Sequence, residues 1–221
     1  MSHNSFLHWI AVPALVTVLL SAGCSQTSNA ENGSKQERAE ALIQRAGKSF
    51  ADSDFRKNLD LLKEAAATDP QNIRVWWKLC EAYQLTEELD LAVKACEQQL
   101  TLHPSSISHN GLGLVYLAKK DYAKAASEFE KAASDSDVPV IHSNYVWSLL
   151  CSKQYAKAVP ASLRLLEFSK DSDAYARLGV AYAGTGQSDA ARNAFQKAGW
   201  KSCEMEKDEK YDLVLRCVGQ N

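Results

Sequence analysis

Small and apolar residues recur every 33 residues along most of this chain. An alanine keeps the same period, at Ala92, Ala125, Ala158 and Ala191. Four further stations share one phase, and they read Leu79-Cys80-x-x-Tyr83, Leu112-Gly113-x-x-Tyr116, Tyr145-Val146-x-x-Leu149 and Leu178-Gly179-x-x-Tyr182. A unit of two short helices cannot bury its apolar face alone, so such units stack side by side. The pattern predicts an all-α solenoid with a concave groove.

One unit, residues 106–139, shows most clearly a helix, a turn and a second helix. Leu112, Gly113 and Tyr116 belong to the first helix, and Lys120-Asp121-Tyr122 forms the turn. In the second helix, Ala125, Phe129 and Ala132 follow at i, i+4 and i+7, which places them on one face. These residues resemble the tetratricopeptide repeat, in which small residues let two helix backbones approach closely. The same pattern is met at Trp76, Leu79, Tyr83, Ala92 and Pro104, and again at Tyr175, Leu178, Gly179, Tyr182, Gly186, Ala191, Phe195 and Ala198.

The repeat extends to about five helix-turn-helix units over residues 38–204. The unit at 139–171 departs most from the pattern, because Val146 replaces a small residue and Pro160 lies inside the second helix. Upstream, residues 41–50 predict a first helix, and a second follows it with Phe55, Leu62, Ala65 and Asp69-Pro70. Residues 205–221 are predicted to form a capping helix or tail at the C-terminal end.

The N-terminal segment has the features of a leader. Residues 6–23 contain no Asp, Glu, Lys or Arg, and the run ends in Leu20-Ser21-Ala22-Gly23-Cys24. Its most apolar part, residues 9–20, is shorter than the roughly 20 residues of a membrane span and matches the core of a signal peptide. Small residues before a cysteine resemble the lipobox of bacterial lipoproteins.

This resemblance implies that residues 1–23 are cleaved and that Cys24 carries the lipid anchor. Residues 24–37 would then be a flexible tether, since Ser25–Glu37 contains no large apolar residue. Ser25 after the cysteine implies the periplasmic face of the outer membrane of a Gram-negative bacterium. Two departures leave an uncleaved inner-membrane anchor as the alternative: residues 1–5 lack Lys and Arg, and Ser21 stands where leucine is usual.

The remaining five cysteines leave several pairings open. Cys80 and Cys96 lie on facing helices of one unit, where they are either disulfide-bonded or small core residues. A bridge between Cys203 and Cys217 would attach the C-terminal segment to the end of the solenoid. Cys151 remains, without a Cys-x-x-Cys motif or a neighbouring histidine to activate it.

Charge and motifs argue against several classes of function. The 221-residue chain has a net charge of −2 and no basic stripe, which argues against a nucleic-acid partner. No histidine pair has metal-ligand spacing, and no phosphate loop or nucleophile elbow is present. His109 and His142 take the place of the first-helix aromatics Trp76 and Tyr175, which favours packing roles. We therefore expect no catalytic residue, metal, cofactor or small-molecule substrate.

The first helices also predict the lining of the groove, because the face beside the core stripe points to the concave side. That face is mostly apolar and contains two tryptophans. Its predicted members are Trp77, Glu81, Gln84, Asn110, Leu114, Leu117, Ser143, Trp147, Leu150, Ala176, Val180 and Ala183, with Arg74, Lys78 and Arg177 beside them. Such a groove suits an amphipathic helix or an extended apolar peptide from a protein partner, with Trp77 and Trp147 as anchors. The alternative is that the chain's own termini or the solenoid curvature cover it.

Together these features predict a non-catalytic, lipid-anchored adaptor that assists an envelope complex, such as pilus, secretin or peptidoglycan machinery. An envelope enzyme or thiol-redox protein that uses Cys151 or the pair Cys203 and Cys217 is the alternative.

Overall fold

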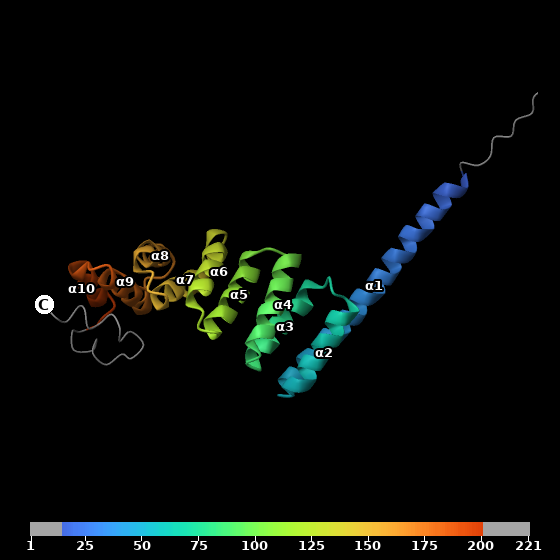
Figure 1. Cartoon of the computed structure of the whole chain (residues 1–221), viewed down its shortest axis with the longest axis horizontal. Coiled ribbons are helices and arrows are strands. Elements are labelled where there is room, and N and C mark those ends of the chain that lie inside the picture. Colours follow the sequence, from blue (N-terminus) through green and yellow to red (C-terminus); the bar gives the residue numbers. More distant parts are fainter. Residues whose placement is uncertain (1–14, 201–221) are drawn as a thin grey trace, which may run out of the picture.

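The computed structural model describes the chain from residue 15 to residue 200. Within this range ten α-helices form five antiparallel pairs that stack along the long axis of the molecule, as Figure 1 shows. The pairs are α1 (Leu15–Ala51) and α2 (Phe55–Thr68), α3 (Ile73–Leu85) and α4 (Leu89–Leu102), α5 (Ser106–Ala118) and α6 (Tyr122–Ser134), α7 (Pro139–Cys151) and α8 (Tyr155–Phe168), and α9 (Ser172–Gly184) and α10 (Ser188–Lys197). The predicted all-α solenoid of five units is confirmed. The predicted capping segment, with Cys203 and Cys217, lies outside the described residues.

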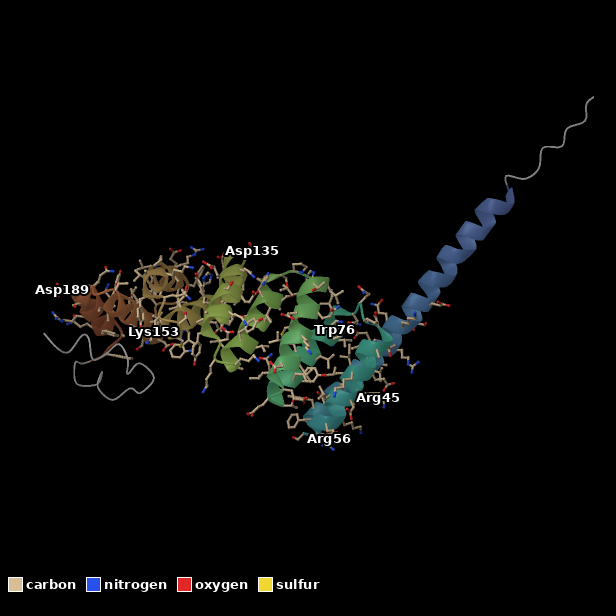
Figure 2. The ribbon with its side chains drawn as sticks, in the orientation of Figure 1. Arg45, Arg56, Trp76, Asp135, Lys153 and Asp189 are labelled. Atoms are coloured by element: carbon tan, nitrogen blue, oxygen red, sulfur yellow. A yellow bond between two sulfur atoms is a disulfide. The ribbon has the colours of Figure 1, made fainter. Side chains whose placement is uncertain are left out.

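One turn recurs between the two helices of every pair. Its central residue has a positive φ each time: 60° at Ser53, 60° at Glu87, 61° at Lys120, 59° at Lys153 and 77° at Gly186. Lys153 is labelled in Figure 2. The backbone N–H of the next residue then returns to the first helix, as between Asp121 N and Tyr116 O at 2.9 Å. This bond satisfies a carbonyl that the end of the helix would otherwise leave open.

The helices of each pair cross closely at one recurring position. A Cβ atom added to Gly113 would lie 2.8 Å from the Phe129 ring, and one added to Gly179 would lie 2.6 Å from the Phe195 ring. The four periodic alanines, Ala92, Ala125, Ala158 and Ala191, are completely buried. The predicted close approach of the two backbones is therefore confirmed.

The two residues that occupy this crossing are 16 residues apart in the sequence. Their relative sizes change from one unit to the next. In the unit at 139–171 the same two positions hold Val146 and Ser162, both fully buried, so a larger first-helix residue accompanies a smaller second-helix one. In the unit at 73–102 the two positions hold Cys80 and Cys96, which form a disulfide with their Cα atoms 5.2 Å apart.

The N-terminal segment differs from its prediction. The residues expected to form a flexible tether, 25–37, are helical and belong to α1. They contain no proline, so the first-repeat helix continues through them. Residues 33–38 are exposed, and Ala39 is the first residue of α1 that the core buries among those whose burial is described. Cys24 falls within α1, but its side chain lies outside the described part. None of the helices described is long and apolar enough to cross a membrane.

Candidate functional site

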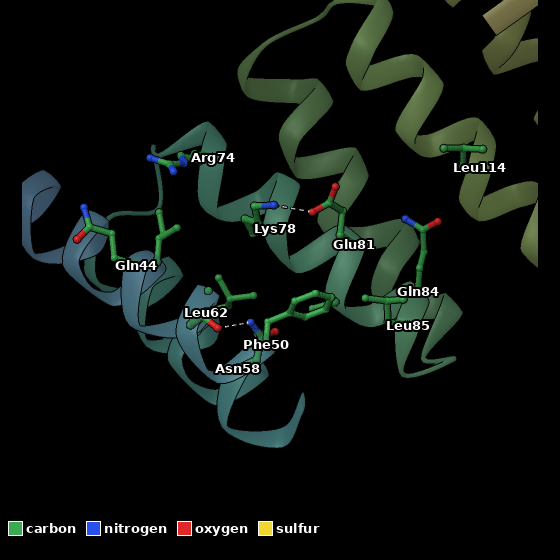
Figure 3. A pocket seen from close by; sticks show the side chains of 14 residues that line it. Gln44, Phe50, Asn58, Leu62, Arg74, Lys78, Glu81, Gln84, Leu85 and Leu114 are labelled. Carbon is green, nitrogen blue, oxygen red and sulfur yellow. Dashed lines mark hydrogen bonds and ion pairs between the residues drawn. The ribbon is translucent and has the colours of Figure 1, made fainter. Parts of the chain in front are cut away.

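A hollow of about 570 Å³ opens between the first helices α1 and α3. Figure 3 shows its lining side chains. Four lining residues of each of these helices have the spacing i, i+3, i+4 and i+7, which places each set on one helix face. They are Ile43, Ala46, Gly47 and Phe50 of α1, and Lys78, Glu81, Ala82 and Leu85 of α3, and Gln44 of α1 and Arg74 and Gln84 of α3 line the hollow beside them. Asn58 and Leu62 of α2 and Leu114 of α5 also line the hollow.

The apolar side chains around this hollow are uncovered. Phe50 is 46% exposed, Leu85 59% and Leu114 37%. Figure 3 places Phe50 and Leu85 together at one end, with Arg74, Lys78 and Glu81 toward the other. The hollow therefore has an apolar end and a charged end.

Five polar side chains of the hollow, those of Arg74, Lys78, Glu81, Asn58 and Gln84, already have a partner within the chain. Arg74 Nη1 lies 2.7 Å from Glu40 Oε2, and Lys78 Nζ lies 2.8 Å from Glu81 Oε2. The Asn58 side-chain amide donates to the carbonyl oxygen of Ala46 at 2.8 Å. Gln84 donates to the carbonyl oxygen of Cys80 at 3.3 Å.

The predicted groove residues divide between this hollow and other surroundings. Arg74, Glu81, Gln84 and Leu114 line it, together with Lys78. Trp77, 38% exposed, is not among the lining residues, and Lys78 Nζ lies 4.0 Å from the centroid of its ring. The face of α3 toward the hollow is thus turned by about one residue from the predicted stripe. Each residue adds about 100° of rotation around the helix axis, so residue spacing alone locates a helix face only to within about one residue.

Sequence reasoning missed the contribution of α1 and two exposed residues farther along the solenoid. The periodic face of α1 includes Ile43 and Phe50, and the spacing that identifies it was readable. Ile107 is 67% exposed and Val140 58% exposed. They lie three residues before the predicted groove residues Asn110 and Ser143, which are partly buried, as is Leu117. Extending the predicted stripe by one turn would have found Ile107 and Val140.

Toward the C-terminal end the expected lining is buried. Val180 is 2% exposed, Leu150 7%, and Ala176 and Ala183 are also in the core. Helices α7 and α9 contact each other here, because their small facing residues allow close packing. The prediction that these residues line an open groove is wrong for this end.

Arg177 crosses the same region from α9 to α7. Its side chain donates to the carbonyl oxygen of Ser143 at 2.5 Å and pairs with Asp173 at 2.6 Å. The guanidinium carbon lies 5.7 Å from the centroid of the Trp147 ring. Trp147 packs against the C-terminal hydrophobic cluster, so it is a partly buried core residue in this structure.

The disulfide stands next to the open hollow. Gln84 Nε2, on the lining helix α3, lies 3.4 Å from Cys80 Sγ. Cys151 is partly buried at the C-terminal end of α7. The placement of Cys203 and Cys217 falls outside the described range.

The histidines take structural positions. His142 is 5% exposed, its Nε2 lies 2.8 Å from the carbonyl oxygen of Ser136, and its ring stacks on Phe168. Trp76, labelled in Figure 2, makes the equivalent bond in its own unit, to the carbonyl oxygen of Pro70 six residues back at 2.8 Å.

His109 lies between the first and second helices of its unit, with Nδ1 2.7 Å from Glu128. Burial acts to raise the pKa of Glu128, but hydrogen bonds from Lys131 and His109 outweigh it and lower that pKa. Among the residues described, no group of three or more His, Cys, Asp or Glu side chains could hold a metal ion.

Comparison with known proteins matches two of these units to a family model. The family model "Tetratricopeptide repeat" matches residues 108–134 and 172–198, which are parts of the pairs α5/α6 and α9/α10. The chain thus contains tetratricopeptide repeats, and its fold is the solenoid of that family. The curated proteins include no significant match.

Several solved structures share this fold. The crystal structure of MamA aligns with a TM-score of 0.68 at 20% identity, covering 78% of this chain and 96% of that chain. YrrB, described as a tetratricopeptide-repeat protein with an unusual peptide-binding site, aligns with a TM-score of 0.68 at 17% identity over 86% and 96%. PilW, described as a widely conserved type IV pilus biogenesis factor, aligns with a TM-score of 0.59 at 20% identity over 81% and 88%. At these identities the likeness concerns the fold.

Proposed function

We propose that this protein is a non-catalytic adaptor that holds a segment of a partner protein in the hollow between α1 and α3. The observation that carries the proposal is the exposed apolar lining of the hollow, with Phe50 and Leu85 together at one end and Leu114 apart from them on α5. An apolar patch with a polar rim typically marks a protein interaction site in a soluble domain. The closed packing of α7 and α9 restricts the binding surface to the N-terminal part of the concave side.

The fold relatives support an adaptor in an assembly process. YrrB is described by its peptide-binding site, and PilW by a part in pilus biogenesis. We propose by analogy that the chain assists an envelope complex, such as pilus, secretin or peptidoglycan machinery.

Two features favour a position outside the cytoplasm. The sequence before Cys24 resembles a lipobox, which supports a lipid anchor at that cysteine and, with Ser25, the outer membrane. The disulfide between Cys80 and Cys96 suits an oxidising compartment, where such bonds persist. In a Cys24→Ser variant, the precursor should stay unprocessed and incorporate no fatty-acid analogue. Unchanged mass and labelling would contradict the lipid anchor.

Leu85→Glu tests partner binding at the hollow. A charge in the apolar end should reduce partner recovery from membranes by more than about tenfold, which corresponds to a loss of about 1.4 kcal/mol of binding free energy. Leu163→Glu is the matched control, since Leu163 is 45% exposed on α8, away from the hollow. Both variants should melt like the parent, because substitution of an exposed side chain changes stability by about 0.5 kcal/mol or less. Equal recovery from the two variants would refute binding at the hollow.

A further inference from the structure

We infer that the segment held in this hollow is an α-helix with an uncharged apolar face, and that it crosses α1 at Gly47. This inference rests on the proposed function and specifies the partner that the hollow accepts. It depends on four properties of the lining: its helical register, its hydrogen-bonded polar side chains, its glycine and its paired charges.

The register of the walls fits a third helix. The stripes on α1 and α3 have the spacing i, i+3, i+4 and i+7, which is the pattern by which helices pack against one another. Leu62 of α2, which is almost completely buried, adds a further apolar side chain to the lining. A helix laid between these stripes meets mainly apolar side chains of α1 on one side. On the other side it meets Ala82 and Leu85 of α3 and the ion pair of Lys78 with Glu81.

The hydrogen-bonding groups of the hollow argue against an extended peptide. An extended segment leaves its backbone N–H and C=O groups in need of partners, and burying them unpaired is costly. The side chains of Arg74, Lys78, Asn58 and Gln84 already bond within the chain. A helix satisfies its own backbone and needs none of them.

Gly47 is the residue at which the bound helix approaches α1 most closely. Glycine inside a helix lowers helix stability relative to alanine, so its presence calls for a reason. A Cβ atom at Gly47 would meet nothing within 4 Å, so no contact within the described chain requires glycine there. With Ala46 and Ala82, Gly47 forms a low stretch in the lining, over which another helix backbone can pass closely.

The charges of the lining define the face that binds. Arg74 is paired with Glu40, and Lys78 with Glu81, so the ion pairs at the charged end leave no net charge. An acidic or basic helix face therefore gains no counter-charge on entering. The complementary face is apolar, with a small residue where the helices cross.

Photo-crosslinking in the full-length chain tests the inference. A benzophenone amino acid replaces Gln44, Leu85, Leu114 or Ile107, one at a time, in native membranes, and the crosslinked partner residues are mapped by mass spectrometry. We expect partner residues separated by three, four or seven positions, as on one helix face. Gly47→Leu should lower the crosslinking yield at Gln44 by more than about tenfold, since it fills the crossing point.

Gly33→Leu is the matched control. Gly33 lies in the same helix, and a Cβ atom there also meets nothing within 4 Å, but it is not part of the hollow. Both substitutions remove a helix glycine at an open position, so neither should lower the melting temperature. The control should leave the crosslinking yield unchanged.

The outcomes separate this inference from the proposed function. Partner residues that alternate by two, crosslinks to residues 201–221 of the chain itself, or an unchanged yield in Gly47→Leu would each overturn the helix assignment. Crosslinks to a partner from position 107 alone would keep an adaptor but refute a helix at Gly47. No crosslink from any concave position would refute both.

Discussion

At the scale of single residues, the recurring turn combines one backbone conformation with different side chains. The turn position with the left-handed backbone conformation is occupied in successive units by Ser53, Glu87, Lys120, Lys153 and Gly186. Only glycine adopts this conformation without a steric cost from its Cβ atom. The turn was predictable from Lys120-Asp121 and Gly186. Its exact recurrence was not, because four of the five units fill the position with a residue that gives no local signal.

Exchanging glycine and lysine between two of these turns tests the strain. Lys153→Gly should raise the free energy of unfolding by about 0.5–1 kcal/mol, since it relieves the Cβ clash at a φ of 59°. Gly186→Lys should lower it by about 1 kcal/mol, through backbone conformation alone, because a Cβ atom there meets nothing within 4 Å. Urea denaturation measures both. A loss of stability in both variants would show that side-chain contacts, and not φ, govern this position.

At the scale of elements, the pairs of helices are held by interchangeable contacts at one crossing. The two equivalent positions, 16 residues apart, hold glycine and phenylalanine in two units. They hold valine and serine in another unit, and a disulfide in a fourth. The period of the sequence predicted which helices cross and that Ala125 lies at the contact. It left the disulfide between Cys80 and Cys96 open, because two small buried residues and a bonded pair produce the same pattern. The helical state of residues 25–37 was missed because polar composition without proline is compatible with both a tether and a helix.

Replacing the Cys80–Cys96 disulfide with the glycine–phenylalanine contact of the pairs α5/α6 and α9/α10 tests whether the two kinds of contact are equivalent. Cys80→Gly with Cys96→Phe should keep the fold, and its stability should not respond to dithiothreitol. The parent should lose about 3 kcal/mol on reduction, given a separation of 16 residues between its cysteines. Cys96→Phe alone should be destabilised by about 1–3 kcal/mol, because the ring would then meet a side chain at position 80. Thermal melts with and without reductant provide the comparison. A double variant no more stable than Cys80→Ala with Cys96→Ala would refute the equivalence.

At the scale of the whole molecule, the concave side is open at one end and closed at the other. Sequence spacing placed Trp77 and Trp147 on adjacent faces of first helices, two units apart. It could not show that α7 and α9 pack against each other while α1 and α3 leave a hollow, since that depends on how neighbouring units close on one another. The small residues Ala176 and Ala183 were a signal of the closed end, but the same residues are compatible with an open surface.

The two tryptophans should consequently differ in what they contribute. Trp77→Ala should change the free energy of unfolding by about 0.5 kcal/mol or less, because Trp77 is 38% exposed and does not belong to the hydrophobic core in either half of the solenoid. Trp147→Ala should lower it by about 2–3 kcal/mol, somewhat less than for a fully buried tryptophan, since the ring packs on the C-terminal cluster and under Arg177. Urea denaturation of the two single variants measures the difference. Equal, small effects would mean that the C-terminal concave face is open after all, and that the binding surface runs the full length of the solenoid.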